Sequence, residues 1–202
     1  SAASDVYKRQ AYWRGQARDF LHAMLTRVAP LPSTLPRDST ALSAWLGDEQ
    51  ASTGQAFQRY LHQRQTGAPR RFFPHRAHAF YFLRHVAPTK LVDGAWLYAL
   101  LRRWRDPRYA GLVRIYLEEL GKGEPQANHV LMFWRLLTRL DCDAGSQLAP
   151  RYFTQGAIQL CLAWLGEEFL PEVVGFNLGY EQLPLHLLIT VCELRELGIE
   201  DE

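Results

Sequence analysis

Apolar side chains recur every three or four residues along almost the whole chain, which is the period of an amphipathic α-helix. The run of Phe20, Leu21, Met24, Leu25 and Val28 shows this spacing near the start. No segment of four or more residues alternates convincingly between apolar and polar side chains, as a half-buried strand does. The pattern therefore predicts an all-α protein, a bundle of helices without a sheet.

Prolines and glycines divide this periodic pattern into separate helices. A proline-rich stretch at 30–36 predicts the first loop, and Gly67-Ala68-Pro69 predicts the second. Pro88 predicts the start of a helix, because proline is favoured in a first turn, and Pro184 predicts a bend in the last helix. The expected helices cover 40–65, 75–86, 89–104, 107–121, 125–140, 153–169 and 172–197.

The two ends of the chain differ from the rest of the sequence. Residues 1–10 resemble the translated linker that often begins metagenomic fragments, so we expect the fold to occupy 11–202. At the other end, a helical pattern stops at Gly198 and is followed by only a few residues. We therefore expect a single helical domain that is a fragment, incomplete at its C-terminus.

Length and composition are those of one globular domain, with 202 residues of which 48% are hydrophobic and 22% charged. No apolar run is long enough to span a bilayer, so we expect no membrane segment. The three cysteines are odd in number and lack a CxxC spacing, which argues against a disulfide scaffold and a zinc ribbon. This cysteine usage favours a reducing compartment, and we expect a cytoplasmic protein.

Charge is distributed unevenly. The stretch 50–92 has no Asp or Glu, whereas its basic residues run from Arg59 to Lys90. From Cys142 onward the chain is acidic, with Arg151 and Arg195 as its only Arg or Lys residues. This asymmetry is compatible with a nucleic-acid surface, but no recognised reading motif accompanies the arginines, so we expect no nucleic-acid partner. The simpler interpretations are that the two halves pack together or that a missing part is acidic.

Three ionisable side chains fall on apolar helix faces. Glu119 follows apolar residues three, four and seven positions earlier, and His129 precedes others four, seven and eleven positions later. Glu181 has apolar residues at helical spacing on both sides. A buried carboxylate costs several kcal/mol unless it is paired or binds a metal. In contrast, Asp93 is interpreted as a first-turn residue and Glu168 as a helix-end residue.

Helical bundles commonly satisfy such residues with metal, as carboxylates and histidines from facing helices converge on two ions. Oxygen and imidazole ligands without thiolate suit iron or manganese better than structural zinc. Glu119, His129 and Glu181 are therefore the predicted metal ligands. In the competing interpretation they are hydrogen-bonded residues of a non-catalytic helical scaffold or partner-binding module.

Four segments carry a more specific signal. They are Ala87-Pro-Thr-Lys-Leu-Val-Asp-Gly-Ala-Trp-Leu97, Glu118-Glu-Leu-Gly-Lys-Gly-Glu-Pro-Gln-Ala-Asn-His129, Gln155-Gly-Ala-Ile-Gln-Leu160 and Gly175-Phe-Asn-Leu-Gly-Tyr-Glu-Gln-Leu-Pro-Leu-His186. From about residue 75 to the end, the chain resembles the iron-containing redox enzyme family, the haem-oxygenase-like di-iron oxidases and oxygenases. The resemblance implies a haem-oxygenase-like bundle with a non-haem di-iron centre. It also implies that O₂ oxidises a small-molecule substrate of the amine, amino acid or fatty acid type.

The resemblance assigns ligands to the same three residues. Glu119, Gly121 and His129 match a family motif of glutamate, glycine and histidine, and Glu181 matches the glutamate of its Gly-Tyr-Glu motif. The remaining family ligands, a His and an Asp, come from a final helix beyond the last residue of this sequence. We therefore expect the fragment to lack a stable two-metal centre and to be inactive. Exposed apolar surface left by that helix predicts poor solubility or a homodimer.

Overall fold

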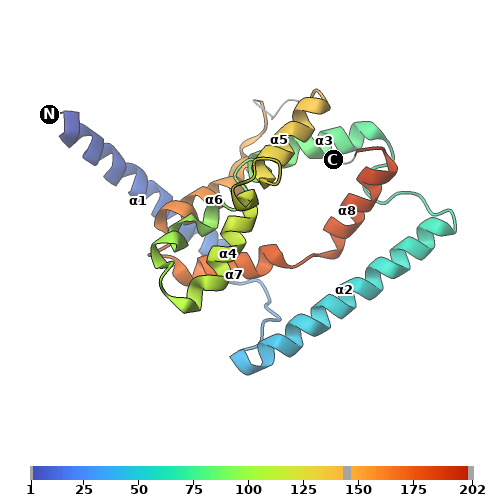
Figure 1. The fold of residues 1–202 in the computed structure, drawn as a ribbon, viewed down its shortest axis with the longest axis horizontal. Helices are drawn as coiled ribbons and strands as arrows, with labels where there is room; N and C mark the ends of the chain where they lie inside the picture. Colours follow the sequence, from blue (N-terminus) through green and yellow to red (C-terminus); the bar gives the residue numbers. More distant parts are fainter. Residues whose placement is uncertain (1, 143–146, 200–202) are drawn as a thin grey trace. The chain divides into compact units, whose positions relative to one another are not determined.

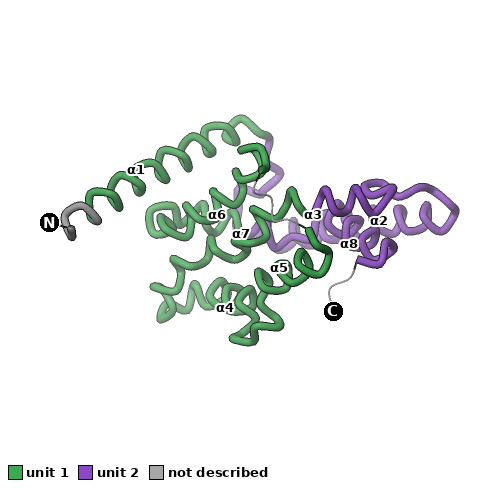
Figure 2. Tube along the Cα trace, turned by 90° about the horizontal axis from the view of Figure 1, so that it is seen from above, with its two compact units in different colours: residues 1–31, 84–177 green, residues 32–83, 178–202 purple. Residues whose placement is uncertain are grey.

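The computed structural model describes residues 2–142 and 147–199, and it confirms an all-α protein (Figure 1). In those two ranges every regular element is an α-helix or a 3₁₀-helix, and no strand occurs. Within them, too, no helix combines the length and the apolarity needed to cross a bilayer. The chain divides into two compact units (Figure 2).

Unit 1 comprises residues 1–31 and 84–177. Its core lies along the 3₁₀-helix η2 (Ala95–Arg103), whose Trp96, Leu97 and Leu100 are at most 1% exposed. Helix α6 (Thr154–Leu165) and helix α4 (Ala110–Glu119) both pack on η2. The remaining elements of the unit are η3 (Pro107–Tyr109), η4 (Gly121–Gly123), α5 (His129–Arg139), η5 (Pro150–Phe153) and most of α7 (Leu170–Glu181).

Helix α1 (Ala2–Val28) packs against α6 in unit 1. It begins at Ala2, so the backbone of 2–10, expected to lie outside the fold, continues the helix. Glu168 accepts hydrogen bonds from Arg14 Nε at 3.0 Å and Arg18 Nη2 at 2.7 Å, and these bonds attach α1 to the segment after α6. Glu168 is therefore more than the helix-end residue expected from the sequence, because it links two segments that are distant along the chain.

Unit 2 comprises residues 32–83 and 178–202. It contains η1 (Ser39–Ala41), α2 (Leu42–Gln65), the first half of α3 (Arg76–Lys90) and α8 (Leu185–Glu196). Helix α2 packs against α8. The expected helix at 40–65 is confirmed as η1 followed directly by α2, with Asp38 accepting a hydrogen bond from Thr40 N at 2.9 Å at its start.

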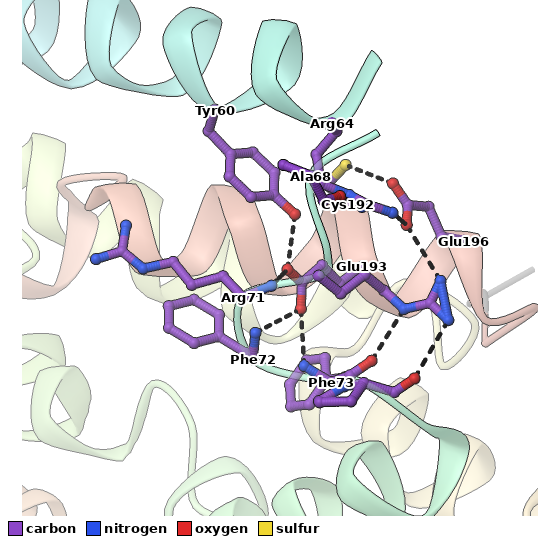
Figure 3. Close-up of polar contacts among 11 residues, drawn as sticks. Tyr60, Arg64, Ala68, Arg71, Phe72, Phe73, Cys192, Glu193 and Glu196 are labelled. Atoms are coloured by element: carbon purple, nitrogen blue, oxygen red, sulfur yellow. Dashed lines mark hydrogen bonds and ion pairs between the residues drawn. The ribbon is translucent and has the colours of Figure 1, made fainter. Parts of the chain in front are cut away.

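The centre of unit 2 is the carboxylate of Glu193, a residue that is 0% exposed (Figure 3). Tyr60 donates its hydroxyl hydrogen to Oε1 over 2.6 Å, and the amides of Phe72 and Phe73 donate to Oε2 over 2.9 and 2.8 Å. The amide of Arg71 donates to Oε1 as well. These bonds hold the loop between α2 and α3 against α8.

The same contacts explain part of the charge asymmetry. Arg64 Nη2 lies 2.6 Å from Glu196 Oε2 (Figure 3). Arg70 Nη1 lies 3.5 Å from the same oxygen. Within unit 2, the basic stretch therefore packs against the acidic C-terminal stretch, as the simpler interpretation of the sequence expected.

The hydrogen bonds at Glu193 shift two pKa values. Burial raises the pKa of the Glu193 carboxyl, but the Tyr60 hydroxyl and the three amides stabilise the carboxylate more, so its pKa lies below the usual value. Burial raises the pKa of the Tyr60 hydroxyl, and its hydrogen bond to the neighbouring Glu193 charge raises it further. Both shifts favour a charged glutamate beside a neutral tyrosine.

Two helix boundaries differ from the sequence-based prediction. Pro88 does not start a helix but lies inside α3, which ends two residues later at Lys90. The next helix, η2, starts instead after Gly94, which adopts the left-handed conformation with a φ of +79°. Pro184 interrupts the last helix rather than bending it, because the residue before a proline is disfavoured in the helical conformation. The result is two helices, α7 and α8, where one was expected.

Candidate metal centre

Three side chains of unit 1 converge at the ends of its helices. One ligand atom each from Asp93, Glu119 and His129 lies within 4.8 Å of the other two. They come from the turn before η2, the last residue of α4 and the first residue of α5. Two carboxylates and one imidazole therefore meet from three segments, although 36 positions separate the first residue from the last.

Gly94 allows Asp93 to approach α4. At φ +79°, it adopts a left-handed conformation that other residues rarely occupy. A Cβ atom at this position would lie 2.7 Å from Glu119 Cβ, closer than carbon atoms approach without displacement. Only a glycine therefore lets the turn after Asp93 pack directly against the Glu119 side chain.

A second tight turn returns the chain from Glu119 to His129. It passes through η4, where Gly121 has φ +69° and Lys122 has φ +53°. A Cβ on Gly121 would lie 2.5 Å from the carbonyl carbon of Ala127. Asn128 then accepts a hydrogen bond from Leu131 N over 3.0 Å and begins α5 at His129. His129 Nδ1 lies 2.7 Å from Glu119 Oε2 as a result.

The cluster has a buried side and an open side. The side chain of Asp93 is 2% exposed and that of Glu119 is 11% exposed, whereas that of His129 is 47% exposed. Asp93 forms an ion pair with Lys90, but its other oxygen, Oδ1, is buried and accepts no hydrogen bond from the described residues. Such an oxygen is costly to bury without a partner, and a cation at this position would provide one.

Asp93 is the residue that sequence analysis missed. It was interpreted as a first-turn residue, but η2 begins at Ala95 and Asp93 lies buried in the preceding turn. The available signal was the pair Asp93-Gly94, since an Asp followed by Gly indicates a turn rather than a helix interior. The periodicity argument considered only residues on helix faces and therefore gave no reason to select it.

Glu119 and His129 were both predicted as ligands, and the structure brings them together. Glu119 is nearly buried, as expected from its helix face, but His129 is half-exposed because it is the first residue of α5. Glu181 is not part of the cluster of three. It belongs to unit 2, where it is exposed rather than directed into a core, since it is the last residue of α7 and the apolar face ends there.

Comparison with known proteins identifies the family. The model of the iron-containing redox enzyme family matches residues 80–202, a range that includes Asp93, Glu119, His129 and Glu181. No curated protein and no solved structure matches the chain. The family match covers more than half of the sequence and agrees with the all-α structure. The chain is thus a member of the iron-containing redox enzyme family, whose general role is that of an oxidoreductase.

Proposed function

We propose that this protein is a non-haem iron oxidoreductase whose iron is held by Asp93, Glu119 and His129. The observation that supports this most strongly is the convergence of their three ligand atoms within 4.8 Å of one another. Oxygen and imidazole nitrogen are the donors that iron and manganese accept in helical proteins. The proposal deepens the family assignment by naming the residues that bind the metal.

The donor set fits an iron ion in charge as well as in chemistry. Asp93 and Glu119 together carry two negative charges into a nearly buried position, where Lys90 forms an ion pair with Asp93 and His129 lies beside Glu119. A divalent cation would balance this charge and would satisfy the buried Oδ1 atom of Asp93. When bound, iron supplies the redox chemistry that activates O₂ for the oxidation of a small organic molecule.

The residues of the chain position the metal ligands, provide negative charge and limit the access of water to the site. The turns at Gly94 and Gly121 hold the two carboxylates and the imidazole in fixed relative positions. The buried Trp96, three residues after Asp93, donates a hydrogen bond from Nε1 to Asn177 Oδ1 over 3.2 Å, which keeps the indole in place. Burial of Asp93 limits the access of water to its carboxylate, and the exposed face of His129 leaves access for O₂ and substrate.

A dinuclear iron centre is proposed on the family resemblance, and Glu181 is proposed as a further metal ligand. Its support is the resemblance of Gly179-Tyr180-Glu181 to the family's Gly-Tyr-Glu motif. The substrate class also rests on the resemblance, which points to an amine, an amino acid or a fatty acid. Manganese is an alternative occupant, because it accepts the same oxygen and nitrogen donors.

Metal analysis of purified variants tests the three ligands. We expect Asp93→Asn, Glu119→Gln and His129→Gln each to reduce bound iron at least tenfold, about the loss that follows removal of a metal-site hydrogen bond or ligand. Glu118→Gln is the matched control, because Glu118 is the exposed neighbour of Glu119 and pairs only weakly with Lys122 at 3.4 Å. Equal iron content in E119Q and E118Q proteins would exclude the proposed centre.

Iron titration of the Glu181→Gln variant tests the second site separately. If Glu181 is a ligand, the variant binds fewer iron ions than the parent protein, or binds the last of them more weakly. An unchanged titration curve shows that Glu181 is not a ligand and leaves the centre formed by Asp93, Glu119 and His129. Circular dichroism spectra that match the parent spectrum confirm that each variant keeps its helices.

A further inference from the structure

A second candidate site lies in unit 2, in a hollow of about 460 Å³ beside α2. Its lining comes from α2, from the loop between α2 and α3, and from Leu185 of α8. Four arginines, Arg59, Arg64, Arg70 and Arg71, contribute to this lining, and no acidic residue does. The hollow therefore collects positive charge from four side chains.

The two nearby carboxylates do not neutralise this charge. Glu193 is fully buried, and its oxygens are occupied by Tyr60 and by three loop amides (Figure 3). Glu196 is shared between Arg64 and Arg70. One carboxylate thus serves two guanidinium groups, and among the residues that the structure describes no carboxylate pairs with Arg59 or Arg71.

Arg59 and Arg71 are both exposed, so their guanidinium groups are accessible to a ligand. Figure 3 shows the Arg71 side chain extended away from Glu193, without an ion pair to the residues drawn. The carbon at the centre of its guanidinium lies 5.6 Å from the centroid of the Phe72 ring, which restricts the side chain without consuming its charge.

We propose that this hollow binds a small molecule through an oxyanionic group, a phosphate or a carboxylate. Guanidinium groups recognise both through parallel N–H donors, and their hydrogen bonds to oxyanions are among the strongest in proteins. Arg59 and Arg71 would contact the anion, and Arg64 and Arg70 would add to the positive potential. Ala56, Pro69 and Leu185 give the hollow an apolar part that suits the carbon skeleton of an organic anion.

This proposal is independent of the iron centre, because every residue in it belongs to unit 2. It also accounts for the basic stretch that begins at Arg59, whose role the sequence left open. A single-stranded nucleic acid is the competing ligand for such a stretch. A hollow of about 460 Å³ favours a small anion over an extended polymer, since a polymer needs a groove that follows its backbone.

Calorimetric titration of the full chain at low ionic strength tests the proposal, with pyrophosphate and citrate as probes. We expect at least one probe to bind, and we expect Arg59→Gln and Arg71→Gln each to weaken its binding about tenfold. Saturation by pyrophosphate alone identifies a phosphate site, and saturation by citrate alone identifies a carboxylate site. Arg71→Lys should give an intermediate loss, because it keeps the charge but not the planar donor pair.

Arg37→Gln is the control, because Arg37 is exposed in unit 2 and lies outside the hollow. Its binding should match the parent protein. The proposal is overturned if neither probe binds, or if R37Q weakens binding as much as R59Q and R71Q. It is equally overturned if a single-stranded oligonucleotide binds more tightly than both probes and all three variants reduce its binding alike.

Discussion

His129 Nδ1 lies 2.7 Å from Glu119 Oε2, and the two side chains meet because the chain turns back on itself between α4 and α5. The turn depends on Gly121, and the approach of Asp93 to the same carboxylate depends on Gly94. Two glycines therefore determine the geometry of the candidate centre as much as its ligands do. Substitution of a glycine therefore tests this geometry without removing a ligand.

We expect Gly94→Ala to reduce iron binding without removing any ligand. The substituted Cβ would lie 2.7 Å from Glu119 Cβ, so the turn that carries Asp93 must move away from α4. Gly67→Ala is a closely matched control, because Gly67 also has a positive φ, +94°, but a Cβ there meets nothing within 4 Å. Both variants carry backbone strain of about 1–2 kcal/mol. Iron content should fall in G94A alone, and a fall in both would refute the geometric explanation.

Gly156→Ala should destabilise unit 1 by about 3 kcal/mol, a typical cost of overpacking. A Cβ at this buried position of α6 would lie 2.3 Å from the carbonyl oxygen of Pro88, so α6 and α3 could not keep their separation. Gly54→Ala in α2 should instead stabilise the protein by about 1 kcal/mol, because a Cβ there meets nothing and alanine favours a helix. In urea unfolding, the free energy of unfolding should be lower than the parent value for G156A and higher for G54A.

Stability should fall in acid because of Glu193. Its folded-state pKa lies below the unfolded value of about 4.3, so its contribution is present above that pH and is lost as the pH falls through the folded-state value. The pKa of Tyr60 is raised in the folded protein. Its contribution to stability is therefore present below about pH 10 and is lost at higher pH. Thermal unfolding as a function of pH should show both losses. Glu193→Gln should flatten the acid limb, and an unchanged limb would contradict this assignment.

Tyr60→Phe should lower the free energy of unfolding by about 2 kcal/mol, the usual value for one hydrogen bond to a charged group. The substitution removes the only side-chain donor in the bonds to Glu193 described above and leaves the ring in place. Tyr98→Phe provides the comparison, since Tyr98 is 58% exposed. Equal stability of Y60F and the parent protein in urea would show that the amide donors alone are sufficient.

The bonds between α1 and Glu168 should be weak and sensitive to salt. Hydrogen bonds from Arg14 and Arg18 lower the pKa of the Glu168 carboxyl, but all three groups are partly exposed, so their net contribution is below about 1 kcal/mol. Glu168→Gln should speed hydrogen exchange of the α1 amides at low salt, and the difference should shrink at high salt. Glu124→Gln, an exposed change elsewhere in unit 1, should leave that exchange unaltered.

Sequence analysis recovered the helical segments well because their apolar spacing is a local property. The prediction of 40–65 matches η1 and α2 closely, and that of 107–121 matches η3 and α4. It was less accurate at Pro88 and Pro184, where the position of a helix end depends on the neighbouring residues as well as on the proline. The start of η2 depends on Gly94, whose left-handed conformation no periodicity indicates.

Within the candidate centre, Glu119 and His129 were predictable because each shares a helix face with apolar residues. Asp93 was not, because it belongs to a turn and has no face to share. Its role emerges from its contact with a residue 26 positions later in the sequence. The arginines beside α2 were similarly visible as a basic stretch, but the sequence could not show which of them Glu196 neutralises.

The amino-acid sequence by itself determined that the protein is helical, where most of its helices lie, and which family it resembles. These properties follow from spacing and from motifs, which a linear chain contains in full. The tertiary structure decided that Asp93 joins Glu119 and His129, and that Arg59 and Arg71 line the hollow beside α2 without pairing with a carboxylate of the described residues. Such outcomes depend on distances between atoms far apart along the chain, and only the packing of the helices sets those distances.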